Sequence, residues 1–203
     1  MGDVVVSLHG VSKRYGPIQA LEGVALELRA GEVHCLAGEN GAGKSTLIKI
    51  LTGAIKRDSG EYLIDGEDIG SPSPAQAREA GIGVVYQELS LLPDLSVGEN
   101  PRVLIFDEPT TALSEAETKA LLARIHGLRD EGHAVMYVTH HLEEMFEIGD
   151  RVTVLRDGGL VTSQPMSDFD QDSLIASMVG RKIESLYPAS NRTVGYFDPL
   201  PVR

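Results

Sequence analysis

The sequence predicts an α/β fold with a parallel sheet core flanked by helices and an antiparallel β side sheet. Short apolar runs typical of buried strands alternate with helical patterns along most of the chain, and this alternation indicates a parallel sheet with helices on both faces. The β-rich segments that precede a glycine-rich loop would form the side sheet. With 203 residues, 42% of them hydrophobic, the chain is long enough for one domain with a sizeable core.

The first half of the chain contains most of the expected strands. A turn at Asp65-Gly66 marks a hairpin, and the apolar run before the glycine-rich loop leads directly into a helical pattern. In order, we expect strands at Val4–Leu8, Val24–Leu28 and Val33–Leu36, a helix at Lys44–Leu51, a strand at Glu61–Ile64, a helix at Pro74–Ala80 and a strand at Ile82–Tyr86.

In the second half, Val103–Phe106 has the apolar pattern of a fully buried parallel strand. Ser114 and Glu117 form a capping box that opens a helix to about Arg129, which Gly132 ends. The remaining elements are a strand at Ala134–Val138, a helix at Leu142–Ile148, a hairpin of Arg151–Leu155 with Leu160–Thr162, and a helix at Asp172–Val179. Residues 181–203, with three prolines, are expected to be a linker or frayed end.

Composition excludes several classes of protein. Lys and Arg number 18 against 30 Asp and Glu, a net charge of −12, which argues against nucleic acid as the main partner. The single cysteine, Cys35, permits no internal disulfide and is expected to be a buried core residue, which fits the cytosol. We expect no membrane-spanning run and no signal peptide.

The strongest motif is the segment GENGAGKS, which matches the P-loop pattern G-x-x-x-x-G-K-[ST] between an expected strand and an expected helix. Glycines let backbone N–H groups converge on phosphate oxygens, and the following helix N-terminus adds a positive dipole. Lys44 should reach the β- and γ-phosphates of a nucleotide, and Ser45 should coordinate Mg²⁺. The expected ATP-binding residues are Gly38, Glu39, Asn40, Gly41, Ala42, Gly43, Lys44, Ser45 and Thr46.

A second motif, VLIFDE, places two acidic residues at the C-terminal end of a buried strand, where ligands bind in open α/β sheets. Asp107 can hold Mg²⁺, directly or through water, and Glu108 is placed to polarise the attacking water. The two motifs together predict a P-loop NTPase.

The segments Asp107–Thr110 and Ala112–Ser114 resemble the Walker B and D-loop region of ABC transporter ATPases. This resemblance implies roles for three more residues. Gln87 would be the Q-loop glutamine that ligates Mg²⁺, His140 the switch histidine that contacts the γ-phosphate, and Tyr15 the aromatic residue that stacks on adenine.

The runs GIGVVYQELSLLP and MVGRKIESLYP resemble the ATPases of ribose-, galactose- and xylose-type importers. The resemblance extends to about Pro188 and implies membrane permease subunits and a second ATP-binding cassette as partners. It also implies a peripheral location on the cytoplasmic face of the inner membrane. Residues 1–180 would be the ATP-binding domain.

The sequence departs from this family between Asn100 and Pro101, where a helical subdomain carrying the LSGGQ-like signature is expected but missing. The run Leu95–Glu99 resembles the signature, but a proline and then a strand follow it instead of a helix, so it fits the flank of the Q-loop. The fifteen residues 88–102 suffice for a parallel crossover. The chain would be a gene fragment, an internally deleted product or a natural half-protein.

Three functions remain open at this point. The first is the ATP-hydrolysing subunit of a sugar importer. The second, as the alternative to the first, is a truncated remnant that binds Mg-ATP without turnover or transport, and the missing signature is the feature that discriminates between the two. The third is another P-loop enzyme, such as a GTPase or a small-molecule kinase; the absence of the guanine-reading N-K-x-D pattern counts against the GTPase.

Overall fold

A computed structural model describes residues 2–85 and 101–180. Its elements are β1 (Val4–Tyr15), β2 (Ile18–Arg29), β3 (Glu32–Ala37), α1 (Lys44–Leu51), β4 (Ser59–Ile64), β5 (Glu67–Asp68), α2 (Pro74–Glu79), β6 (Ile82–Val85), β7 (Val103–Asp107), α3 (Glu115–Asp130), β8 (Ala134–Val138), α4 (Leu142–Ile148), β9 (Arg151–Arg156), β10 (Gly159–Pro165), the 3₁₀ turn η2 (Met166–Asp168) and α5 (Gln171–Val179).

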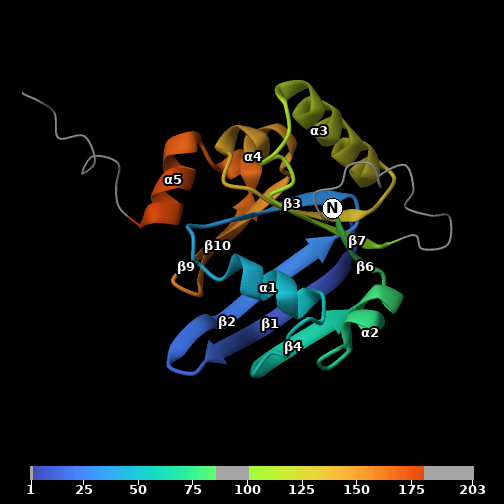
Figure 1. The fold of residues 1–203 in the computed structure, drawn as a ribbon, viewed down its shortest axis with the longest axis vertical. Coiled ribbons are helices and arrows are strands. Elements are labelled where there is room, and N and C mark those ends of the chain that lie inside the picture. Colours follow the sequence, from blue (N-terminus) through green and yellow to red (C-terminus); the bar gives the residue numbers. More distant parts are fainter. Residues whose placement is uncertain (1, 86–100, 181–203) are drawn as a thin grey trace, which may run out of the picture.

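The strands form two sheets (Figure 1). The larger has the order β10-β9-β3-β8-β7-β6, in which β9, β3, β8, β7 and β6 run parallel and β10 is an antiparallel edge. The smaller, β2-β1-β4-β5, is entirely antiparallel. The predicted α/β class, with its antiparallel side sheet, is therefore confirmed.

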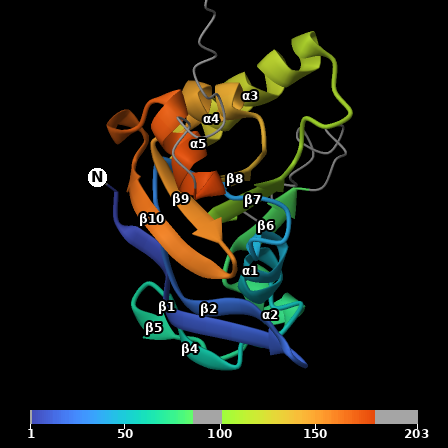
Figure 2. The same cartoon turned by 90° about the vertical axis from the view of Figure 1, so that its left-hand side faces the viewer.

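Two apolar layers cover the two faces of the six-stranded sheet. Helix α1 and the antiparallel sheet lie on one face, and α3, α4 and α5 lie on the other (Figure 2). Alternating residues of β7 show the division, because Val103 and Ile105 pack in the first layer while Leu104 and Phe106 pack in the second. Cys35 is fully buried in the second layer, as predicted.

Local sequence signals set several helix boundaries. Ser114 and Glu117 form the predicted reciprocal capping box at the start of α3, and Gly132 follows its end with a φ of 97°. A second capping box, between Ser73 and Gln76, begins α2. Helix α5 starts one residue earlier than predicted because the Asp170 side chain accepts a hydrogen bond from the Ser173 N–H.

The first two strands were predicted too short. Val4–Leu8 continues to Tyr15, and Val24–Leu28 belongs to a strand that starts at Ile18. Irregularities in the β1–β2 pairing, including one between Leu8 and Val11, interrupt the two-residue alternation from which a strand is recognised. The pairing with β4 on the other side of β1 has its own shift between His9 and Ser12, but it continues to the pair of Ser12 with Ser59, so β1 stays in the sheet.

Residues 86–100, which connect β6 to β7, lie outside the described ranges. Among the described residues 2–85 and 101–180, no helix lies between α2 and α3. The described part thus contains no helical subdomain at this position. The predictions for Gln87, for the run Leu95–Glu99 and for the tail 181–203 all fall on residues outside the described ranges.

Candidate functional site

The P-loop spans the interval from the end of β3 at Ala37 to the start of α1 at Lys44. Its three glycines have φ angles of 151° for Gly38, 85° for Gly41 and 105° for Gly43. A Cβ on Gly38 would lie 2.4 Å from the Leu155 carbonyl oxygen, and one on Gly43 would lie 2.7 Å from the Ala20 carbonyl oxygen. Glycine at these two positions is therefore required by close backbone approach as well as by φ.

The turn between β9 and β10 supports the loop from behind. The Gly158 N–H donates to the Ala42 carbonyl (3.2 Å), and the Gly158 carbonyl accepts from the Glu22 N–H (2.8 Å). The loop is thus fixed between β2 and the β9–β10 hairpin. Because its outer residues Glu39 and Asn40 are exposed, one side of the loop stays open to a ligand.

Lys44 is the buried cation of this loop, with 9% of its surface exposed. Its Nζ donates to the carbonyl oxygens of Gly38 (2.7 Å) and Glu39 (3.1 Å). Burial lowers the pKa of the Lys44 ammonium, while the charges of Glu108 and Asp107 oppose this shift. Negative charge near the P-loop therefore stabilises the charged form of Lys44. Ser45 is exposed and Thr46 half-buried in the first turn of α1.

The acidic pair lies at the C-terminal end of β7, as predicted. Partial desolvation, followed by the charge of Glu108, raises the pKa of the Asp107 carboxyl, and Lys44 opposes this. Glu108 has a φ of 47°, which is uncommon for a residue other than glycine. Its N–H donates to the Val138 carbonyl (2.8 Å), so β8 fixes the strained turn.

His140 lies just beyond the end of β8, next to this pair. Its Nδ1 is 3.4 Å from Glu108 Oε1, and both side chains are accessible, with 55% and 38% exposed. The structure thus brings the predicted switch histidine to the predicted water-polarising carboxylate. His141 is exposed, and its ring centroid lies 4.2 Å from that of His140.

Three neighbouring parallel strands place these groups at one edge of the sheet. β3, β8 and β7 are adjacent, and their C-terminal ends lead into the P-loop, His140 and the acidic pair respectively. Ligands in open α/β sheets bind at this edge. Tyr15 lies at the end of β1, 45% exposed, with Lys13 Nζ 5.6 Å from its ring centroid.

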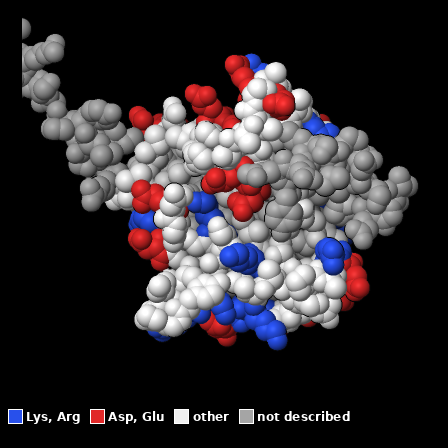
Figure 3. All heavy atoms as spheres, viewed as in Figure 1, with Lys and Arg blue, Asp and Glu red and all other residues white. Residues whose placement is uncertain are grey.

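Charge is unevenly distributed over the face seen in Figure 3. Acidic side chains gather toward α3 and α4, and basic ones toward α1 and the antiparallel sheet. Among the described residues, no group of three or more His, Cys, Asp and Glu side chains is arranged to hold a metal ion.

Comparison with known proteins identifies the family. Residues 21–142 match the family model for ABC transporters. The chain is 39% identical over 251 residues to a ribose import ATP-binding protein of Streptomyces avermitilis, covering 94% of this chain and 50% of that one. It is 38% identical over 248 residues to a putative ribose/galactose/methyl galactoside import ATP-binding protein of Burkholderia ambifaria, covering 93% and 48%.

Solved structures share the fold. A nucleotide-free ATP-binding cassette from an ABC transporter superposes with a TM-score of 0.73 at 17% identity, covering 91% of this chain and 99% of that one. The ADP conformation of another ATP-binding cassette of an ABC transporter gives a TM-score of 0.73 at 18% identity, covering 92% of this chain and 99% of that one. The chain spans about half the length of the curated relatives it matches. Since the family model covers more than half of its residues, the chain belongs to the ABC transporter family.

Proposed function

We propose that this chain binds Mg-ATP and is an ATP-hydrolysing subunit of an ABC-type sugar importer, coupling ATP hydrolysis to carbohydrate transport. One observation carries the proposal. The buried Lys44 of a complete P-loop, the acidic pair and His140 all follow the C-terminal ends of three adjacent parallel strands. A triphosphate on the P-loop would therefore have a carboxylate and an imidazole beside its terminal phosphate.

The P-loop residues would bind the phosphates. Backbone N–H groups of residues 39–46 would hold phosphate oxygens, and Lys44 would exchange its two carbonyl acceptors for the β- and γ-phosphates. Tyr15, exposed at the end of β1, would stack on the adenine. These roles fit the lowered pKa of Lys44, because a bound anion compensates its desolvation.

The donor set suits Mg²⁺. Ser45 is exposed at the start of α1, and the charge of the Asp107 carboxylate acts on the neighbouring P-loop residue Lys44. Hydroxyl and carboxylate oxygens are the ligands that Mg²⁺ prefers. Gln87, the third ligand we propose, lies outside the described residues. When bound, the ion would neutralise charge on the phosphates.

Glu108 and His140 would act on the terminal phosphate. Glu108, held in a strained turn by the Val138 carbonyl, would accept a proton from the attacking water. His140, 3.4 Å away, would orient that carboxylate and contact the γ-phosphate. Because phosphoryl transfer depends mainly on positioning and charge, such placement is the main contribution of the protein.

The transport role rests on the relatives, which are named as ribose and galactose import ATP-binding proteins. By analogy, permease subunits and a second ATP-binding cassette would be the partners, and nucleic acid would not. The chain would act at the cytoplasmic face of the inner membrane. Within the described ranges, no helix has both the length and the apolarity to cross a membrane.

A second candidate is a remnant that binds Mg-ATP without turning it over. The alignment to the Streptomyces relative extends over 251 residues, more than the 203 residues of this chain, so that relative carries residues without a counterpart here. This supports our proposal that the domain is shortened between Asn100 and Pro101, where a signature motif would supply donors to the γ-phosphate. Losing one preorganised donor set typically costs about 10²–10³ in rate.

Phosphate release by the purified chain separates the two candidates, with Glu108→Gln as the blank. A rate of about 1 s⁻¹ or more, typical of enzymes, would establish hydrolysis by the chain alone. If the chain alone releases phosphate slowly and the rate rises when an intact homologous cassette is added, hydrolysis at a site shared by the two cassettes is supported. Mg-ATP binding without release in either assay would identify a remnant.

A further inference from the structure

A partly buried hydrogen-bond network connects the end of β8 to α4. Glu144 Oε2 on α4 accepts hydrogen bonds from the Tyr137 hydroxyl (2.7 Å) and from Thr139 Oγ1 (3.0 Å). Thr139 Oγ1 in turn accepts from the backbone N–H of His141 (3.0 Å). Tyr137 and Thr139 are almost entirely buried, with 0% and 1% of their surfaces exposed.

The protons of this network have one consistent assignment. Each hydroxyl has a single proton, so both Tyr137 and Thr139 donate to Glu144, and the Thr139 oxygen is left to accept the His141 N–H. Burial, followed by the Glu144 carboxylate, raises the pKa of Tyr137, which keeps its phenol a neutral donor. An acceptor at position 144 is therefore required by two buried hydroxyls.

The network encloses His140 on both sides along the chain. Thr139 precedes it and is bonded to Glu144, while the N–H of His141, which follows it, is bonded back to Thr139. His140 itself is 55% exposed, and its contact with Glu108 is a single approach of 3.4 Å. Its side chain therefore depends on the short backbone turn for its position, and Glu144 anchors that turn.

We propose that Glu144 is a positioning residue for His140, which holds the 139–141 turn so that the imidazole meets Glu108. The importance of this for ATP hydrolysis rests on the proposed function, but the placement of His140 does not.

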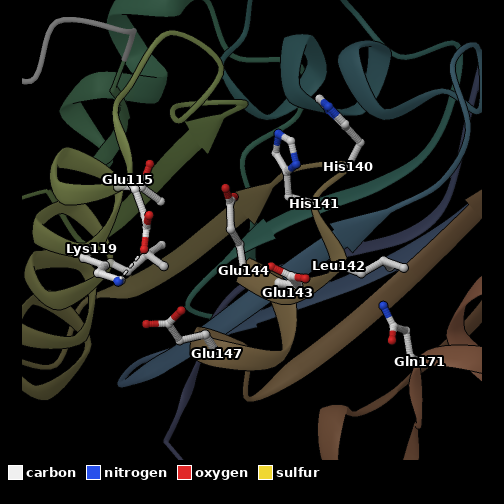
Figure 4. Close-up of a pocket in the computed structure, with 11 residues that line it drawn as sticks. Glu115, Lys119, His140, His141, Leu142, Glu143, Glu144, Glu147 and Gln171 are labelled. Atoms are coloured by element: carbon white, nitrogen blue, oxygen red, sulfur yellow. Dashed lines mark hydrogen bonds and ion pairs between the residues drawn. The ribbon is translucent and has the colours of Figure 1, made fainter.

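Neighbouring acidic residues do not share this role. Glu143, Glu144 and Glu147 all line a groove of about 570 Å³ between α3 and α4. In Figure 4, Glu144 extends toward His141, whereas Glu143 and Glu147 point elsewhere in the groove. Glu143 is exposed and has no hydrogen bond or ion pair to another described residue. Glu143→Ala is therefore a matched control that removes the same charge from the same helix.

The test follows His140 by NMR in the full-length chain, with histidine imidazoles labelled with ¹³C and His140 assigned by His140→Gln. With Glu144 intact, introducing Glu108→Gln should shift the His140 ring resonances, because the side chains at positions 108 and 140 are in contact. In Glu144→Ala this response should fall by at least about half, since the ring loses its fixed position. Glu143→Ala should keep the full response, and Glu144→Gln, whose amide oxygen accepts both hydroxyls, should restore it.

An unchanged response to Glu108→Gln in folded Glu144→Ala would overturn the proposal. If Glu144→Ala fails to fold, Thr139→Val replaces it, since it removes the same bridge, and Thr139→Ser is its rescue. A second readout is ATP turnover with an intact homologous cassette. Glu144→Ala should lower kcat about tenfold to 10²-fold with KM unchanged. If the wild type shows no turnover, the proposed hydrolysis fails, while the NMR result still decides the role of Glu144.

Discussion

Replacing Lys44 by alanine tests the P-loop directly. In the structure, Nζ donates to two carbonyl oxygens of its own loop, at 2.7 and 3.1 Å. Binding of a triphosphate would exchange both for charged phosphate oxygens. The ammonium already makes charge-assisted hydrogen bonds to the two carbonyl oxygens, and phosphate oxygens are stronger acceptors because they are charged as well. Hydrogen bonds to charged groups are worth about 1.5–3 kcal/mol, and we take a net gain of roughly 1–1.5 kcal/mol for each exchange. The variant should therefore lose about 2–3 kcal/mol, or about 30- to 150-fold in Mg-ATP affinity.

Titration with a fluorescent ATP analogue in the presence of Mg²⁺ measures this loss. Lys49→Ala is the matched control, because it removes one positive charge from the same helix at an exposed position. Screening should limit its effect to about twofold. If Lys44→Ala binds within about threefold of the wild type, or no more weakly than Lys49→Ala, the assignment of Lys44 to the phosphates is refuted.

Three further predictions concern the base, the loop and pH. Tyr15→Ala should weaken ATP binding by about 1–3 kcal/mol and leave inorganic triphosphate binding unchanged; equal losses in calorimetry would make Tyr15 a packing residue. Gly38→Ala should lower the thermal midpoint by at least about 4 °C through its clash with Leu155. Gly41→Ala, where a Cβ meets nothing within 4 Å, should lower it less. Burial holds the pKa of His34 below its ordinary value, so the unfolding free energy should fall as the pH drops below about 6.5. The fall should be less steep in His34→Gln, and equal pH slopes of the unfolding free energy in urea titrations of the two proteins would contradict this.

The sign of the His34 effect follows from proton binding. At a pH below the ordinary pKa of histidine, His34 binds a proton in the unfolded chain but not in the folded chain, because the folded imidazole is buried. Glu32, 3.5 Å from its Nδ1, opposes the shift only in part. Stability is thus complete at neutral pH and is lost as the pH falls toward the folded pKa.

Much of the fold could be predicted because its signals are local. Helix α1 was predicted with its observed bounds, from the P-loop pattern and the apolar run after it. The capping box of Ser114 and Glu117 predicted the start of α3, because it too is a local sequence signal. The length of β1 could not be read in this way, because an irregular pairing register breaks the alternation of its side chains.

The site was predictable to the same extent. The placement of Lys44, Asp107, Glu108 and His140 follows from strand ends, which the apolar runs mark. The partners of Glu144 carry no comparable signal, because Tyr137 and Thr139 meet it only after the chain turns from β8 into α4. No sequence motif includes His34, yet it lies buried, with its Nε2 2.7 Å from Thr153 Oγ1.

The support of the P-loop by the β9–β10 turn has a consequence for synthesis of the chain. The bond between Gly158 and Ala42 joins residues more than a hundred positions apart. A nascent chain of 150 residues already contains the glycine-rich segment, but not the β9–β10 hairpin that the P-loop contacts. Such long-range contacts form slowly. The nucleotide pocket should therefore mature late, and nascent chains stalled before residue 151 should not retain ATP even though their motif is complete.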